Sequence, residues 1–154
     1  MPAQSFFLFK NKEQTVSGPR LHELFGELIH SYTRGQAIED GVLIDVSETA
    51  RQAGFAWPVA MTAAAWEDCV AWTEEDSRRQ IYQDETGRLW DVVWMASRAV
   101  KATGRVGEQA RLFQLYRVPR GGRGVRQRPA MLKVMVGPGD DGAPVITIVL
   151  PDED

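Results

Sequence analysis

The last third of the chain contains three short stretches that look like β-strands. Leu112–Val118 alternates in the way typical of a strand, and Met131–Val136 and Val145–Leu150 are two more short, mostly apolar stretches that predict strands. The segment Gly137–Gly142 between the last two is dense in glycine, proline and aspartate, a composition typical of turns. Three consecutive strands, the last two joined by a short turn, predict an antiparallel meander, which constrains the fold more than any other feature.

The residues before the meander favour helices. An apolar stripe at helical spacing follows Pro19 and predicts an amphipathic helix, formed by Leu21, Leu24, Phe25, Leu28 and Ile29. Thr33 is a candidate N-cap for a short helix that Gly41 ends. A second helical face runs over Leu89–Val100, with a strand over residues 88–96 as the competing interpretation.

The central stretch, residues 41–72, combines one short strand with two helix starts. Val42–Val46 is rich in β-branched residues and predicts a half-buried strand. Ser47 is expected to cap a short helix that ends at Gly54. Thr62 is expected to cap an alanine-rich helix that extends to about Thr73. Three tryptophans in this stretch are expected in the core, with an aromatic pocket as the alternative: Trp57, Trp66 and Trp72.

The residues between this stretch and the second helical face carry weaker signals. Thr73–Arg79 is expected to be a charged, solvated segment. Ile81 and Tyr82 are candidates for a brief strand, and Asp84 or Thr86 could cap the helix that follows.

Helices first and strands last predict an α+β fold, with N-terminal helices packed on a C-terminal three- to four-stranded antiparallel meander. The strand near Val42 is a candidate to extend that sheet. A chain of 154 residues is expected to form one domain, over residues 19–154. Residues 1–18 are expected to be an N-terminal arm that either docks on the domain or is mobile.

Composition narrows the possible classes of protein. The net charge of −3 argues against polyanion binding by bulk charge. A single cysteine excludes an intramolecular disulfide and a cysteine-based zinc site. No apolar run reaches the length of a membrane span, so we expect a cytoplasmic protein that does not contact membranes.

The most unusual local feature is a run of five arginines within residues 117–128, interleaved with glycine: Arg117, Arg120, Arg123, Arg126 and Arg128. Guanidinium groups suit carboxylates and phosphates, so this segment is the candidate contact with a protein partner, a nucleoprotein complex or nucleic acid. The alternative is a solvated hairpin tip. If all five arginines met duplex phosphates, binding would have a log–log salt slope of about −4.5. The segment has no aromatic residue to stack on bases, which disfavours single-strand binding.

The sequence gives little support for a metal site. His22 and His30 are eight residues apart, which is about 12 Å along a helix and too far to share one ion. Asp140 and Asp141 lack the ligand pattern of a calcium loop, and a turn explains them. We therefore predict no metal and no cofactor.

Catalytic motifs are equally scarce. Cys69 lies on the face of its helix that is expected to be buried, which predicts an inert thiol, although pairing with His22 or His30 stays open. Asp45 is the best lone carboxylate for acid–base chemistry, and capping of a turn explains it equally well.

Five stretches carry a family resemblance: Tyr32–Ser47, Arg51–Ala60, Gly137–Gly142, Val145–Ile148 and Leu150–Asp154. Over about residues 25–154, the chain resembles a bacterial family of unknown function that is carried mainly on plasmids and integrative conjugative elements. The family has no assigned catalytic or binding residues to transfer. The resemblance implies a genomic setting, that of accessory genes of mobile DNA.

Three functional hypotheses follow. The first is a non-enzymatic interaction protein of mobile genetic elements, for example an inhibitor of a host defence system such as restriction or CRISPR. The second is a nucleic-acid-binding accessory or regulatory protein. The third is a small enzyme that uses Cys69 or Asp45.

Overall fold

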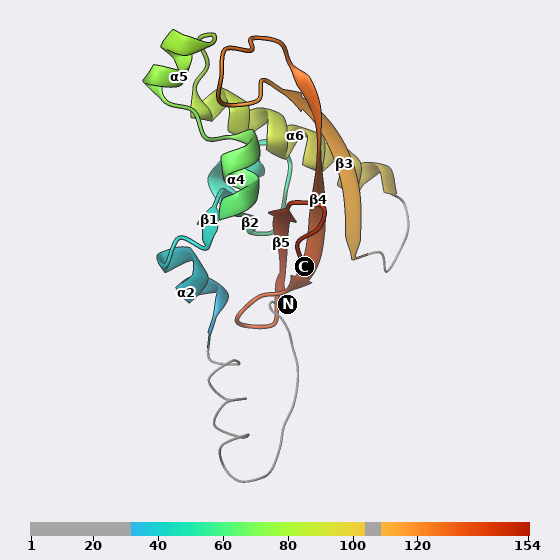
Figure 1. The fold of residues 1–154 in the computed structure, drawn as a ribbon. Coiled ribbons are helices and arrows are strands. Elements are labelled where there is room, and N and C mark those ends of the chain that lie inside the picture. The colour runs from blue at the N-terminus through green and yellow to red at the C-terminus, as the bar shows by residue number, and fades with distance from the viewer. Residues whose placement is uncertain (1–31, 104–108) are drawn as a thin grey trace.

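A five-stranded mixed sheet is the framework of the computed structural model, which describes residues 32–103 and 109–154 (Figure 1). The strands lie in the order β1-β2-β5-β4-β3. Their bounds are Leu43–Asp45 for β1, Val59–Thr62 for β2, Ala110–Arg117 for β3, Arg128–Pro138 for β4 and Pro144–Val149 for β5. The predicted amphipathic helix after Pro19, the N-terminal arm and both histidines fall outside the described residues.

The predicted meander is confirmed, because β3 pairs antiparallel with β4, and β4 with β5. The expectation of a purely antiparallel sheet is wrong. Strand β2, which the sequence pattern did not predict, pairs in parallel with β5 and antiparallel with β1. Val59, Ala60 and Met61 are all buried, so β2 lacks the alternation that marks a strand with one solvated face. The sheet is therefore mixed.

Five helices accompany the sheet: α2 Arg34–Glu39, α3 Ser47–Gln52, α4 Ala63–Cys69, α5 Glu74–Arg79 and α6 Glu85–Thr103. The long helix α6 crosses one face of the sheet and packs against α3, α4 and β3 (Figure 1). Alternate residues of the strands project into this layer, including Phe113, Leu115 and Leu132. On the opposite face Arg34 of α2 donates to Thr147 Oγ1 at 2.8 Å.

Side-chain caps explain where several helices begin. Thr33 and Gln36 form a capping box at the start of α2, which confirms Thr33 as the predicted N-cap. Asp140, in the β4–β5 turn, also accepts from the backbone N–H groups of Arg34 at 2.8 Å and Gly35 at 3.1 Å. Asp84 accepts from Gly87 N at 2.8 Å, which confirms the helical interpretation of α6. Asp140 therefore stabilises a helix N-terminus, consistent with the turn interpretation.

Three expectations about local structure are wrong. Ser47 is the first residue of α3 and makes no cap; its hydroxyl donates to Asp45 Oδ1 at 2.7 Å and accepts from Val59 N at 3.0 Å. The helix capped by Thr62 ends at Cys69, short of its expected end near Thr73. The charged segment after it is mostly exposed, as expected, but residues 74–79 form a second helix, α5. Residues 81–82 form no strand. Short charged segments give no periodic apolar signal, so α5 was not apparent.

The three tryptophans have different environments. Trp72 is buried and Trp66 packs against the core, as predicted. Trp57 is 45% exposed, which contradicts its expected core position. It lies just before Pro58 in the connection to β2, and the neighbouring Phe55 takes the buried position.

Candidate functional site

The arginine loop, defined here as residues 117–128, joins β3 to β4 and lies beside α5 (Figure 1). Gln80, which follows α5, holds the loop with its side-chain amide. Its Nε2 donates to the carbonyls of Pro119 at 2.9 Å and Gly124 at 2.6 Å, and its Oε1 accepts from Gly121 N at 2.8 Å. Gly121 adopts a φ of 109°, which a residue with a side chain rarely adopts. The loop is therefore shaped by contacts with α5.

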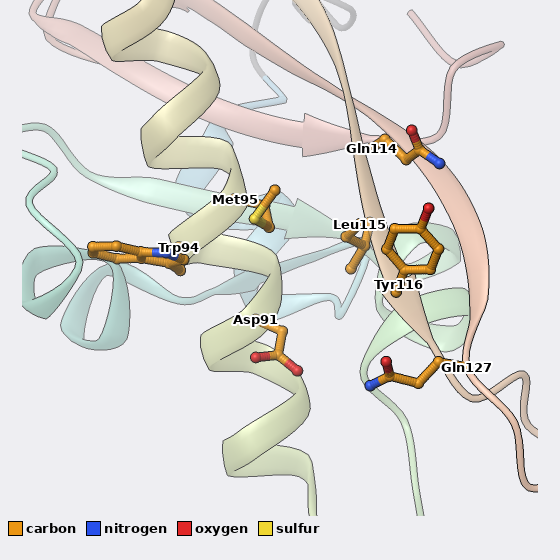
Figure 2. A pocket seen from close by; sticks show the side chains of 7 residues that line it. All are labelled: Asp91, Trp94, Met95, Gln114, Leu115, Tyr116 and Gln127. Atoms are coloured by element: carbon orange, nitrogen blue, oxygen red, sulfur yellow. The ribbon is translucent and has the colours of Figure 1, made fainter.

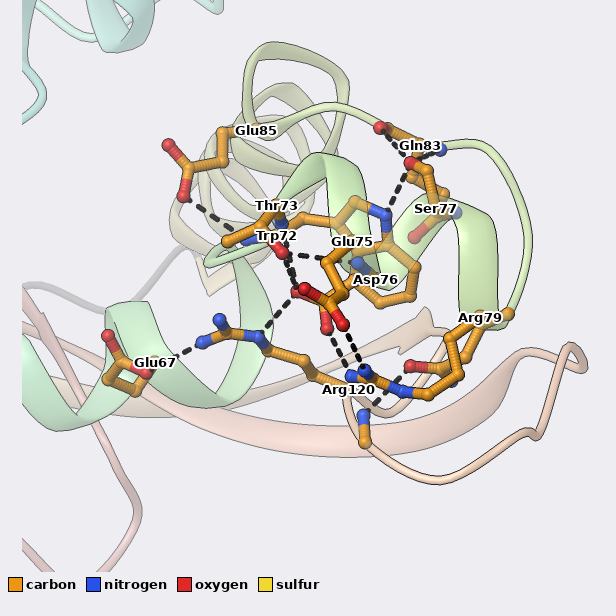
Figure 3. A network of polar contacts seen from close by, with 12 residues as sticks. Glu67, Trp72, Thr73, Glu75, Asp76, Ser77, Arg79, Gln83, Glu85 and Arg120 are labelled. Atoms are coloured by element: carbon orange, nitrogen blue, oxygen red, sulfur yellow. Dashed lines mark hydrogen bonds and ion pairs between the residues drawn. The ribbon is translucent and has the colours of Figure 1, made fainter.

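Two of the five arginines are used within the molecule. Arg117 donates to the carbonyl and the carboxylate of Asp68, both at 2.9 Å. Arg120 reaches Asp76 Oδ2 at 2.8 Å and Glu67 Oε1 at 3.1 Å (Figure 3). These pairs bind the loop to α4 and α5 and balance the charge of both guanidinium groups.

Asp76 is the centre of this network, and only 2% of its surface is exposed (Figure 3). Its carboxylate accepts from the backbone N–H of Thr73 at 2.8 Å and from the Thr73 hydroxyl at 2.9 Å. Arg79 and Arg120 donate to it at 2.7 and 2.8 Å. Burial raises the pKa of Asp76, but the bonds from Thr73 and Arg120 outweigh burial and lower it to about 2. Asp76 is thus a carboxylate at any ordinary pH.

Beneath the loop, Arg88 of α6 is buried, with 4% of its surface exposed. It donates to the carbonyls of Val70 and Val118, both at 3.0 Å, and its guanidinium lies 4.6 Å from the centroid of the Trp72 ring. Burial lowers its pKa. Its Nη2 atom has no protein partner within residues 32–103 and 109–154. Arg88 therefore connects α6, the end of α4 and the start of the arginine loop.

The other three arginines face solvent. The side chains of Arg123, Arg126 and Arg128 are exposed and make no hydrogen bond or ion pair with the part of the chain that the structure describes. They line an open hollow of about 470 Å³ together with Pro119, Gly121, Gly124 and Val125. Guanidinium groups that line one hollow are suited to carboxylate or phosphate oxygens. This "arginine hollow" is the candidate binding site.

The other sequence candidates have structural explanations. Cys69 is buried, and burial is the largest of the effects that raise its pKa to about 12, which disfavours a reactive thiolate. Asp45 accepts from the N–H and hydroxyl of Ser47, as a turn-capping aspartate does. Within the described ranges, no three His, Cys, Asp or Glu side chains are placed to hold a metal ion.

Sequence reasoning missed the residues that organise the arginine loop. Thr73-x-x-Asp76 matches a capping-box pattern, so this part of the network left a signal. Gln80 and Arg88 left none, because their partners lie about thirty to forty residues farther along the chain.

The fold and the site together define a small α+β protein with a preformed guanidinium surface. The chain belongs to the family of unknown function DUF6573, whose model matches residues 23–154. No curated protein and no solved structure matches the chain. In the described ranges, no helix combines the length and the apolar character needed to cross a membrane.

Proposed function

We propose that this protein is a non-enzymatic interaction protein whose arginine hollow binds an acidic surface of a partner protein. The observation that carries the proposal is the division of the five arginines: Arg117 and Arg120 hold the loop, and Arg123, Arg126 and Arg128 have no partner within the described residues. A loop already held in shape loses less conformational entropy on binding, so its arginines can contribute more to affinity.

Two features favour an acidic protein over nucleic acid. The loop contains no aromatic residue on which a base could stack. The whole chain carries a net charge of −3, so a long polyanion would be repelled by the rest of the molecule, whereas a compact acidic patch would meet mainly the loop.

The proposed setting rests on the family resemblance. In a mobile genetic element, the partner would be a host or element-encoded protein, and a component of a restriction or CRISPR system is the concrete version that we propose. Such an inhibitor needs no catalytic group. It needs only a surface that binds the acidic face of its target and so blocks other molecules from that face.

Affinity capture from a bacterial host lysate tests this proposal. We compare the wild type with the double variant Arg123→Glu/Arg126→Glu; Arg128 is left intact because it lies in β4. The control is Arg51→Glu/Arg78→Glu, which changes the net charge equally at side chains that are 65% and 71% exposed and whose ion pairs lie within their own helices. A protein retained by the wild type and the control, but lost by the loop variant, supports the proposal. Equal recovery by all three proteins contradicts it.

Direct nucleic-acid binding is the second candidate, and the same three free arginines favour it. If each neutralised one duplex phosphate, the log–log salt slope would be about −2.7, smaller than the value of about −4.5 for all five. A mobility shift at low salt with this slope would favour the nucleic-acid function. The absence of a shift would exclude it.

A further inference from the structure

The two edges of the sheet differ in how they are protected. Strand β1, at one edge, has three residues and includes Asp45. Strand β3, at the other edge, has eight residues, and its central segment Leu112–Tyr116 carries no charge and no proline. Natural sheets usually protect an edge with short strands, charges or proline. By these criteria, and among the residues that the structure describes, β1 is protected and β3 is open to another strand.

The register shows which backbone groups of β3 point outward. Gln109 O accepts from Val136 N at 2.8 Å, so these two residues form a hydrogen-bonded pair of the antiparallel ladder. Such pairs recur at every second residue, and the residues between them direct their N–H and C=O groups away from the partner strand. Leu112, Gln114 and Tyr116 therefore present six backbone groups to the free edge.

Apolar side chains surround this edge. Leu112 and Tyr116 are more than half exposed on the face of β3 opposite the core. Trp94 and Met95 of α6 line a hollow of about 440 Å³ with Gln114, Leu115 and Tyr116 (Figure 2). An unpaired backbone beside exposed apolar groups is the arrangement used to add a strand from another chain.

We propose that β3 pairs antiparallel with β3 of a second copy, about a two-fold axis at Gln114. The outward-facing residues then meet one another: Gln114 faces Gln114, and Leu112 faces Tyr116 of the second copy. Each facing pair exchanges two hydrogen bonds, giving about six, and the two sheets become one continuous sheet.

The segment is self-complementary in this register, which is why we commit to a second copy. On the exposed face, Leu112 packs against Tyr116 of the second copy in an aliphatic–aromatic cross-strand pair. On the core side, Phe113 lies opposite Leu115 of the second copy. At the ends Arg111 faces Arg117, whose charge is already balanced by Asp68 at 2.9 Å. The interface is mainly backbone and apolar, so its stability should depend little on salt, unlike binding at the arginine hollow.

Light scattering coupled to size-exclusion chromatography tests the proposal on the full chain. We expect a dimer for the wild type and a folded monomer for Gln114→Pro. Proline removes an outward N–H that β4 does not use, so the strand can keep its place in the sheet. Val42→Lys, beside the opposite edge, is the control and should stay dimeric.

A cysteine placed on the axis tests the register. In a hydrogen-bonded pair the Cα atoms lie about 5.5 Å apart, within the range for a disulfide. Under mild oxidation Gln114→Cys should therefore form a disulfide-linked dimer, and Leu112→Cys, which faces a different residue, should not. The buried Cys69 should leave the wild type unlinked.

Three results would overturn the proposal: a wild-type monomer at every concentration measured, a dimer that survives Gln114→Pro, or equal cross-linking of both cysteine variants. If Gln114→Pro fails to fold, the two cysteine variants still decide. A monomer with salt-dependent anion binding would leave the function of the arginine hollow standing, so the two proposals fail separately.

Discussion

Cys69 shows how the position of one side chain limits chemistry. The thiol is buried at the end of α4, and its pKa is raised to about 12, first by burial and then by the neighbouring carboxylate of Asp68. We expect the folded protein not to react with a thiol reagent such as dithionitrobenzoate at pH 8, and to react fully when unfolded. Cys69→Ala should lower the unfolding free energy by about 1 kcal/mol. Rapid stoichiometric labelling of the folded protein would revive the enzyme hypothesis.

Asp76 should make the free energy of unfolding depend on pH in the acidic range. Its folded pKa is about 2, below the usual value of 3.8, so its stabilising effect is complete above pH 4 and is lost as the pH falls towards 2. Asp76→Asn should be clearly less stable than the wild type at pH 7, and the difference in unfolding free energy should shrink between pH 4 and pH 2. Denaturant titrations at several pH values measure it.

Glu75→Gln is the matched control for Asp76→Asn. Glu75 is exposed, and its carboxylate lies 3.9 Å from Arg79 in a surface ion pair, which contributes little to stability. It should change stability little at any pH. An Asp76→Asn difference that stays constant between pH 7 and pH 2 would show that Asp76 does not act through its charge.

At the scale of elements, the contact between α5 and the arginine loop is the most testable. Gln80→Ala removes three hydrogen bonds to Pro119, Gly121 and Gly124 and should cost about 1–3 kcal/mol of local stability. Trypsin should then cleave the loop faster by about fivefold to about a hundredfold, since 1.4 kcal/mol corresponds to a factor of ten. Gln52→Ala, at the exposed end of α3, is the control. Equal cleavage of the variant and the control would show that Gln80 does not hold the loop.

The elements also show what sequence reasoning could reach. The meander, α6 and the caps at Thr33 and Thr62 were predictable because each leaves a local pattern of alternation, periodicity or capping. Strand β2 was not, because its four residues are buried without alternation and lie directly before a helix. Its parallel partner β5 is more than eighty residues away, so no local signal marks the pair.

The candidate site was predictable in composition but not in detail. The density of arginine marked the loop from the sequence. Which arginines are free depends on acidic partners in α4 and α5, about forty to fifty residues away, such as Asp68 for Arg117 and Asp76 for Arg120. That division is a tertiary property, and it changes the predicted binding group from five arginines to three.

At the scale of the whole molecule, the two proposed surfaces have different physical character. The arginine hollow is polar and charged, and its binding should weaken as salt rises. The β3 edge is apolar and presents backbone hydrogen-bonding groups, so its pairing should not weaken as salt rises. The protein is a sheet with a buried apolar core and two outward surfaces for which we propose contacts with other molecules.

Fluorescence titration of the protein with a short labelled oligo-aspartate peptide, a compact acidic ligand, at low and moderate salt tests the central claim most directly. We expect saturable binding that weakens with salt, an affinity at least about tenfold lower for Arg123→Glu/Arg126→Glu, and no such loss for Arg51→Glu/Arg78→Glu. No binding by the wild type, or equal losses in both double variants, would contradict the assignment of the arginine hollow as the binding site.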